Sequence, residues 1–171
     1  MVQIGNIHVG RGSEAEMPRL DASEAYALFN ALTLRYDLIH LTQIYLNFVH
    51  DPDFLVVLKK GMSSFLEEQV NLIENQFNTF KLVMPRRAPK SVNTLSNSQI
   101  MTDELIFRHM WIGMQYFMEQ DVRHATRGIT NDSLRDMFTD FVNDELKNFG
   151  NLTKYGKLKG WFETPPMFLT S

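Results

Sequence analysis

The side chains of this sequence that could do chemistry are carboxylates and imidazoles on predicted helices, above all Asp121, His124 and Glu145. Asp121 and His124 are three residues apart, a spacing that puts both on one helix face, and that face is otherwise apolar. Glu145 falls among phenylalanines, where an ionised carboxylate must be paired, metal-bound or protonated. Carboxylate and imidazole groups bind transition metals in proteins. These three residues are therefore the candidate ligands of any metal site.

A second pair, Asp37 and His40, has the same three-residue spacing. On a helical wheel this pair falls in a polar sector that also holds Asn30, Thr33 and Asn47. A polar sector on an otherwise apolar helix faces water. We therefore expect Asp37 and His40 to lie at the surface and to take no part in an interior site.

A di-iron or di-manganese site in a helical bundle needs more ligands than this sequence offers. Such a site takes a Glu from each of two helices and a Glu-x-x-His motif from each of the other two. No Glu-x-x-His motif is present, and the glutamates of the second predicted helix map to its outer face: Glu67, Glu68 and Glu74. In an ideal bundle Asp121 and Glu145 are about eight residues apart along the axis, roughly 12 Å, which is too far for shared coordination. We therefore predict no bound metal and no other cofactor.

Instead, the inward polar residues predict a buried hydrogen-bond network, because buried polar groups need partners. Its expected members come from three of the predicted helices: Glu145, Asp121, His124, Gln69, Gln76 and Gln120. The alternative is that Glu145, with Asp121 and His124, holds a metal of the iron or manganese type and gives the bundle an oxidase or storage role. A third possibility is a polar interior that receives a small molecule.

Other catalytic chemistry has no support in the sequence. It contains no Gly-rich phosphate loop, no Gly-x-Ser-x-Gly elbow and no His-Glu-x-x-His motif. It also contains no cysteine, which excludes thiol nucleophiles, thiolate metal sites and disulfides. Met110, Met114 and Met118 recur at helical spacing, and methionine at such positions is usually an adaptable core residue. We expect a protein that is not an enzyme.

Long helices must position these residues, and the first is the best defined. From Ser23 to Val49, apolar side chains at helical spacing cover more than half of the circumference. A chain of 171 residues, 44% of them hydrophobic and 22% charged, has the composition of one globular domain. The sequence predicts an N-terminal tail over 1–20 and a single domain over 21–171, with helices at about 23–49, 52–80, 102–127 and 131–157.

The connections between these helices decide the topology. Asp51-Pro52 starts a new helix after a very short turn, and Gly128 separates the third helix from the fourth, so each pair forms an antiparallel hairpin. The 19 residues from Lys81 to Gln99 have no helical pattern and are long enough to run the length of a helix. The predicted fold is all-α, a ferritin-like four-helix bundle made of two antiparallel helical hairpins joined by a long crossover.

Composition also limits the partners and the location. A net charge of −3 and a pI near 5.9 argue against a general nucleic-acid surface. The apolar stretches are interrupted by charges before the roughly 20 residues that a membrane span requires, and the N-terminus shows no signal-peptide pattern. We expect an intracellular protein with no nucleic-acid partner and no membrane span.

Several short motifs follow one another along the chain in a characteristic order. They are the His50-Asp51-Pro52-Asp53 junction, the Met84-Pro85 to Pro89 crossover, the Thr102-Asp103-Glu104 helix start, Tyr155, and the terminal Gly160-Trp161 and Pro165-Pro166, which end the last helix with an aromatic cap. In this order and spacing the chain resembles the spore coat protein F-like proteins of endospore-forming bacteria and the related uncharacterised family of ferritin-like bundles.

The resemblance implies a ferritin-like bundle that serves as a structural or assembly protein and is located in the spore coat. It implies association with other copies of the chain or with other coat proteins, and it supplies no catalytic residue. Some relatives look like two such bundles in tandem, whereas this chain has one. A partner chain would then take the place of the second bundle.

Overall fold

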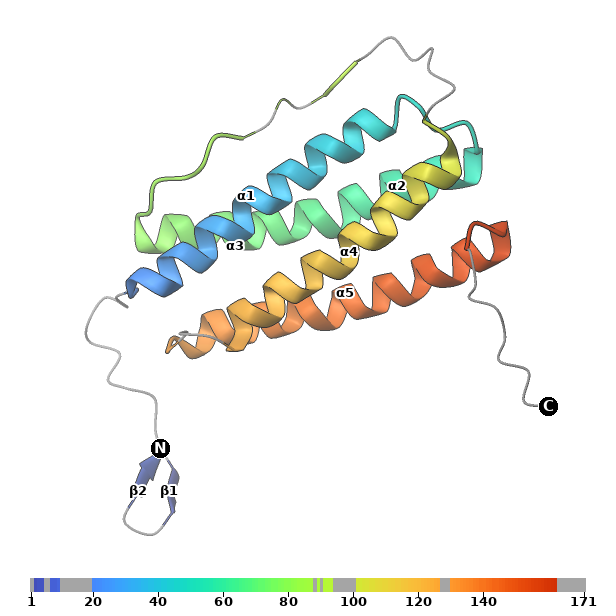
Figure 1. The fold of residues 1–171 in the computed structure, drawn as a ribbon. Helices are drawn as coiled ribbons and strands as arrows, with labels where there is room; N and C mark the ends of the chain where they lie inside the picture. The colour runs from blue at the N-terminus through green and yellow to red at the C-terminus, as the bar shows by residue number, and fades with distance from the viewer. Residues whose placement is uncertain are drawn as a thin grey trace, which may run out of the picture.

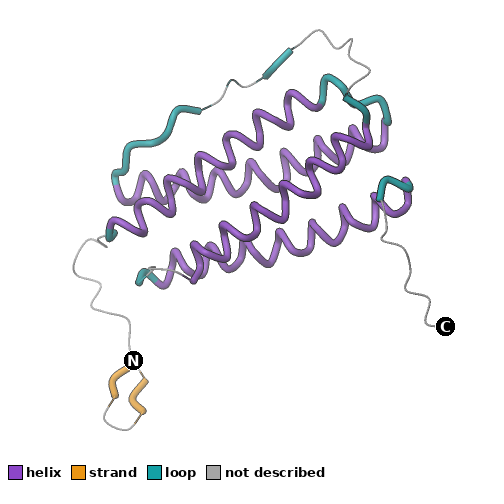
Figure 2. The backbone as a smooth tube through the Cα atoms, viewed as in Figure 1, coloured by secondary structure: helices purple, strands orange, loops and turns teal. Residues whose placement is uncertain are grey.

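The computed structural model describes residues 2–4, 7–9, 20–87, 89, 91–93, 101–126 and 130–162. Within these ranges the chain folds into a bundle of two helical hairpins, as Figure 1 shows from the N-terminal end in blue to the C-terminal end in red. Figure 2 shows how little of the described chain lies outside helices. None of the described helices is long and apolar enough to cross a membrane. The predicted all-α bundle of two hairpins is therefore confirmed.

The first hairpin contains α1 (Ala22–Tyr45) and a second helical rod built from α2 (Pro52–Gly61), η1 (Met62–Leu66) and α3 (Glu67–Phe80). Asp21 caps α1 by accepting from Glu24 N, and the Glu24 side chain accepts from Asp21 N in return. Asp51 caps α2 by accepting from the backbone N–H groups of Asp53 and Phe54, with Pro52 at the start of the helix. These caps satisfy backbone donors that have no partner inside the helix.

A single π-helical turn, η1, interrupts the second rod of this hairpin. It follows Gly61 directly, and a Cβ at Gly61 would have no atom within 4 Å. Glycine here therefore does not serve a close contact between helices. A π turn widens the helix locally and shifts the faces on either side of it relative to each other.

The second hairpin contains α4 (Asp103–Thr126) and α5 (Asp132–Lys159). Asn131 caps α5 by accepting from Leu134 N, and Gly160 ends it in the left-handed conformation with φ 71°. The described part of the connection between the hairpins, 81–93 without 88 and 90, runs beside α1, as Figure 1 shows. Asn47 Nδ2 ties this crossover to α1 by donating to Val92 O at 2.9 Å.

The helices pack as α1 against α3, α4 against α5, and α1 against α4. Their core consists of two separate clusters of buried side chains. One cluster centres on α1 and α3 and includes Leu28, Val70, Phe117 and Phe138. The other lies toward the α1–α2 turn and includes Phe54 and Phe107 among its members: Tyr45, Phe54, Leu58, Ile106 and Phe107.

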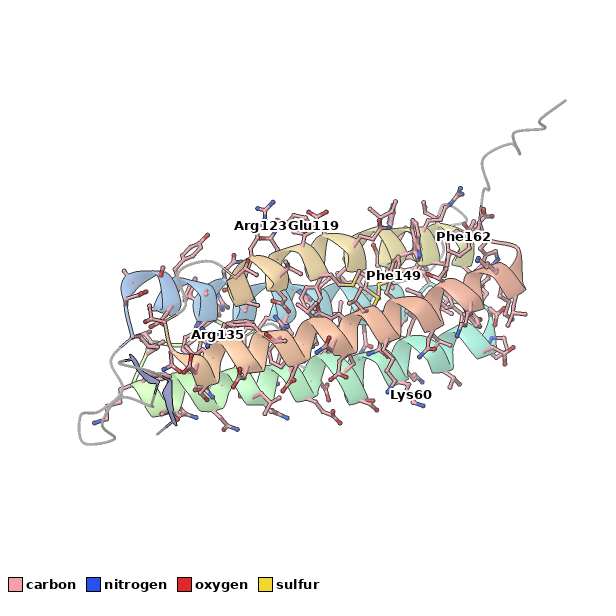
Figure 3. All side chains as sticks on the ribbon, turned by 90° about the horizontal axis from the view of Figure 1, so that it is seen from below. Lys60, Glu119, Arg123, Arg135, Phe149 and Phe162 are labelled. Carbon is pink, nitrogen blue, oxygen red and sulfur yellow. The ribbon has the colours of Figure 1, made fainter. Side chains whose placement is uncertain are left out.

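The end of the chain closes the second cluster with aromatic rings. Trp161 packs edge-on against Phe54 with ring centroids 5.1 Å apart, and Phe162 packs edge-on against Phe107 at 5.2 Å. Phe149 stacks on Trp111 from α5, and Figure 3 labels Phe149 and Phe162 at this end of the bundle. The predicted aromatic cap is present through Phe162, and Pro165-Pro166 lies outside the described residues.

Two differences from the predicted elements concern the N-terminal part. Helix α1 ends at Tyr45 and is followed by a turn over 46–48, so the predicted end at about Val49 was too late. Within the predicted tail, strands β1 (Val2–Ile4) and β2 (Ile7–Val9) pair antiparallel, with Val2 opposite Val9. Alternating apolar side chains in so short a hairpin give too weak a pattern to be recognised in the sequence.

The closest packing around a glycine gives a test of this fold. A Cβ at Gly156 would overlap the Phe107 ring and lie 2.6 Å from Phe162 Cε2, whereas a Cβ at Gly150 would have no atom within 4 Å. We predict that Gly156→Ala destabilises the protein by about 2 kcal/mol because the aromatic cap must move. Gly150→Ala, on the same helix, is the control and should stabilise by up to about 1 kcal/mol. Urea unfolding measures both, and equal effects would contradict this packing.

Candidate functional site

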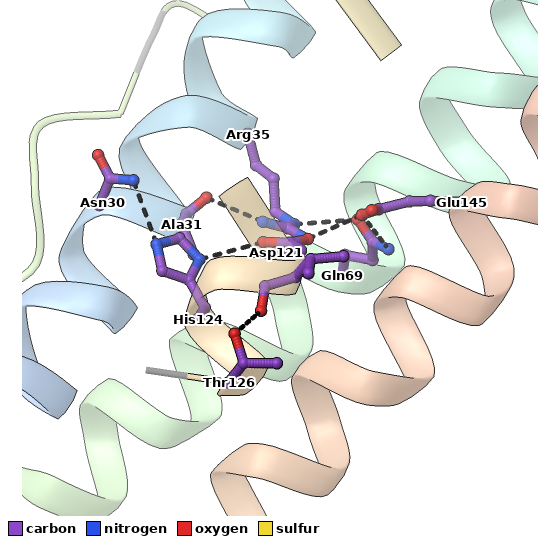
Figure 4. Close-up of polar contacts among 9 residues, drawn as sticks. Asn30, Ala31, Arg35, Gln69, Asp121, His124, Thr126 and Glu145 are labelled. Atoms are coloured by element: carbon purple, nitrogen blue, oxygen red, sulfur yellow. Dashed lines mark hydrogen bonds and ion pairs between the residues drawn. The ribbon is translucent and has the colours of Figure 1, made fainter. Parts of the chain in front are cut away.

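The candidate site is a buried polar cluster to which four helical segments each contribute one side chain. Arg35 comes from α1, Gln69 from α3, Asp121 from α4 and Glu145 from α5. Arg35, Asp121 and Glu145 are fully buried, and Gln69 is 4% exposed. Figure 4 shows these side chains converging in the middle of the bundle.

The Arg35 guanidinium is the centre of this cluster. Its Nη2 lies 2.5 Å from Asp121 Oδ2 and 3.4 Å from Glu145 Oε1. Its Nε donates to Gln69 Oε1 at 3.0 Å, and its Nη1 donates to the backbone oxygen of Ala31 at 3.2 Å. All three guanidinium nitrogens therefore have partners, as a buried charge requires.

Aromatic rings complete the surroundings of Arg35. The guanidinium carbon lies 4.6 Å from the ring centroid of Phe117 and 4.6 Å from that of Phe141. A cation over an aromatic face is stabilised most where water is excluded. The two rings thus hold the guanidinium between α4 and α5 and keep it in place.

His124 supports the carboxylate that faces Arg35. Its Nδ1 lies 3.2 Å from Asp121 Oδ1, and its Nε2 lies 3.3 Å from Asn30 Nδ2. Because an amide nitrogen only donates, this arrangement assigns the acceptor role to Nε2 and the proton to Nδ1. His124 therefore donates to Asp121 as a neutral ring, and Asn30 links the cluster to the edge of α1.

The cluster contains one cation and two carboxyl groups, and these two groups differ in protonation. Burial alone would raise the pKa of Asp121, but the charge of Arg35 and hydrogen bonds with His124 and Glu145 lower it to about 2. Burial, followed by the charge of Asp121, raises the pKa of Glu145 to about 9. At neutral pH, Asp121 is therefore the counter-ion of Arg35, and Glu145 is a neutral acid hydrogen-bonded to it.

The predicted network was partly right in its membership. Asp121, His124, Glu145 and Gln69 do come together. Gln76 and Gln120 are only half-buried, and no hydrogen bond joins either of them to the cluster within the described chain. On α1, Asp37 is exposed as predicted, while His40 is half-buried and lies apart from the cluster.

The predicted axial separation of Asp121 and Glu145 was wrong, because both carboxyl groups reach the same Arg35 nitrogen. Side chains lean toward the N-terminus of their own helix. In the antiparallel pair α4 and α5 these directions are opposed, so Asp121 and Glu145 lean toward each other. An offset counted along the helix axes therefore overestimates the distance between the groups.

Arg35 itself was missed by the sequence analysis. Its signal is its position on α1, four residues after Ala31 and four before Ile39, both of which are buried. A charged residue inside an apolar stripe indicates a buried ion pair when inward carboxylates exist elsewhere. Glu24 was likewise not among the predicted network residues, but it is 1% exposed and its Oε1 accepts from Thr130 N and Asn131 N, both at 2.7 Å.

The residues of the cluster do not fit a metal ion. The side chains that would act as ligands already face a guanidinium, whose positive charge occupies the position that a metal cation would need. Throughout the described ranges, no three Asp, Glu or His side chains come together in an arrangement suited to metal binding. The cluster links four helical segments electrostatically, and its charged side chains are fully buried.

Comparison with known families shows the family to which this chain belongs. Residues 10–171 match the family described as "Protein of unknown function (DUF3231)". The chain belongs to this family. A solved structure from Bacillus halodurans, described as a "putative spore coat protein", has the same fold as this DUF3231 chain, with a TM-score of 0.81 and 16% identity over 90% of this chain and 98% of that one. A comparison with curated proteins found no match.

The proton that Glu145 keeps in the folded protein makes protein stability depend on pH. The folded protein keeps a proton on Glu145 that the unfolded chain releases, because the pKa rises from 4.5 to about 9. This contribution to the free energy of unfolding is complete below pH 4.5, decreases as pH rises and is lost above about 9. We predict that Glu145→Gln, a neutral isostere, shows a weaker fall in stability between pH 5 and pH 9 than the unchanged protein.

Asp121→Asn is the matched variant, because it removes the charge that is paired with Arg35. We expect it to destabilise by roughly 3 kcal/mol at pH 7, and Glu145→Gln by clearly less. Urea unfolding of both variants across this pH range tests the assignment. A larger loss at pH 7 for Glu145→Gln than for Asp121→Asn would show that the charges are assigned the wrong way round.

Proposed function

We propose that this protein is a non-enzymatic structural component of the spore coat, similar to spore coat protein F-like proteins, and that it acts by associating with itself or with other coat proteins. Two observations support this proposal. The fold is that of a protein described as a "putative spore coat protein". In the interior of the bundle, both inward carboxyl groups of the cluster face Arg35.

Arg35 is the observation that carries the proposal. In a catalytic bundle, inward carboxylates are left available for ions or substrates. Here both inward carboxyl groups contact Arg35, and the guanidinium is itself enclosed by two phenylalanine rings. A metal with an oxidase or storage role, the alternative function, would have to displace a buried cation held by hydrogen bonds on all its nitrogens. The arrangement favours a structural role.

The outer surface of the bundle offers apolar side chains for association. On α1 and α4, which pack side by side, Ile112 and Tyr116 are 60% and 58% exposed, and Leu41 and Tyr26 are also exposed. Large apolar groups on adjacent surface helices favour contact with another protein. We assign the contact to the α1 and α4 side, because the described part of the crossover lies beside α1 on the side away from α4 (Figure 1).

Fractionation of spores tests the proposal. A tagged full-length chain is produced in a sporulating, endospore-forming host, and its amount in the extracted coat and in the spore interior is measured by immunoblotting. We expect the protein in the coat fraction. A double variant, Ile112→Lys with Tyr116→Lys, should lose about tenfold of this coat association because two charges disrupt an apolar contact.

Val56→Lys with Leu158→Lys is the control, since it adds the same charge at apolar residues that are 63% and 86% exposed on other helices. It should leave the coat fraction unchanged. Recovery of the unaltered protein in the spore interior would contradict the proposed role. Equal loss from both double variants would contradict the assignment of the contact to α1 and α4.

A further inference from the structure

A cavity of about 530 Å³ lies in the bundle between the two core clusters. Its walls come from α1, from α2 and η1, from α4 and from α5. Leu38 and Phe117 on one side belong to the first cluster, and Val57, Met110 and Leu152 on the other belong to the second. The bundle core is therefore interrupted at one level, although residues above and below that level are tightly packed.

The inner wall of this cavity is apolar. It is formed mainly by leucine, methionine and phenylalanine side chains, among them Phe65 of η1 and Met114 of α4. Gly113 also lines the cavity, and a Cβ at this position would have no atom within 4 Å. The space is therefore left open by a glycine in the middle of a helix, where alanine or leucine would form the helix better.

The π-helical turn shapes the same wall. Every residue of η1 except Ser63 lines the cavity, together with Lys60 and Gly61 before it. A π turn is rare inside an α-helix, and such turns are frequently found at functional sites. Here the irregular turn, a glycine without a close neighbour and the gap in the core coincide.

This cavity and the neighbouring surface differ in charge. Among the residues that line it there is no Asp or Glu, and Lys60 is exposed at its rim beside the amides of Asn148 and Asn151. An adjoining groove between α3 and α5 is instead lined by one base, Lys147, and four acids, Glu68, Asp136, Asp140 and Asp144. On a protein with a net charge of −3, an apolar cavity with a basic, amide-rich rim is selective for an apolar molecule with an anionic end.

We propose that this cavity binds one fatty acid, with the acyl chain between the two core clusters and the carboxylate at Lys60. The volume is within the roughly 300–1,000 Å³ of typical ligand pockets. Apolar cavities in helical proteins bind apolar molecules even when nothing else recruits them. Figure 3 shows Lys60 projecting outward from its helix, and Lys60 is the one Lys or Arg among the residues that line the cavity.

Isothermal titration calorimetry of the full-length protein with laurate, below its micelle concentration, tests the proposal. We expect a single saturable site. Gly113→Leu fills the cavity and should weaken laurate binding by about tenfold or more. Gly150→Leu is the control, because Gly150 is also a helical glycine with open space around it but does not line the cavity. It should bind laurate as the unaltered protein does, and thermal unfolding checks that both variants are folded.

The head group is tested with dodecyltrimethylammonium, which has the same chain length and the opposite charge. Laurate should bind more tightly, and Lys60→Met should weaken laurate binding about threefold, as expected for an exposed charge pair. Lys59→Met, one residue outside the lining, should have no effect. Several weak laurate sites, binding unaffected by Gly113→Leu, or equal binding of the two ligands would each overturn the proposal.

Discussion

The burial of one positive charge, Arg35, determines how the four helical segments come together. A guanidinium in a core is tolerated only when its charge is balanced and its donors are satisfied. Asp121 supplies the charge, while Gln69, Ala31 and the neutral Glu145 complete the contacts. Because Gln69, Asp121 and Glu145 come from α3, α4 and α5, the register of each of these helices is fixed relative to α1. A shift by one turn would leave a buried charge unpaired.

Carboxylates at helix starts fix the ends of the bundle in the same way. Glu24 caps α1 and also accepts from the backbone that begins α5. At the other end, Asp103 accepts from His50 N and Asp51 N, and Lys159 bridges Asp51 and Asp53 at 2.7 and 3.2 Å. The cavity lies between the Arg35 cluster and the end of the bundle that Asp103 and Lys159 hold. The helices are held in register on both sides of the cavity, so they stay aligned despite this gap in the core.

The sequence predicted the helices well because their ends carry local signals. Asp51 caps its helix by the short-range rule used to place it, and Asp21 and Asn131 cap theirs in the same way. It also predicted that Asp121, His124 and Glu145 face inward. It did not predict Arg35. A helical wheel describes one helix at a time, so it cannot show which partner a single charge in an apolar stripe will meet on another helix. It gave too large a separation for Asp121 and Glu145 because axial counting ignores the direction in which side chains lean.

The central claim is that Arg35 is the cation of this core and that no metal takes its place. Elemental analysis for iron, manganese and zinc tests it most directly, on full-length protein purified without chelators or affinity metals from cells supplied with all three. The account predicts less than about a tenth of an equivalent of each metal per chain. About one or two equivalents, lost in Glu145→Ala, would contradict it and make the cluster a metal centre.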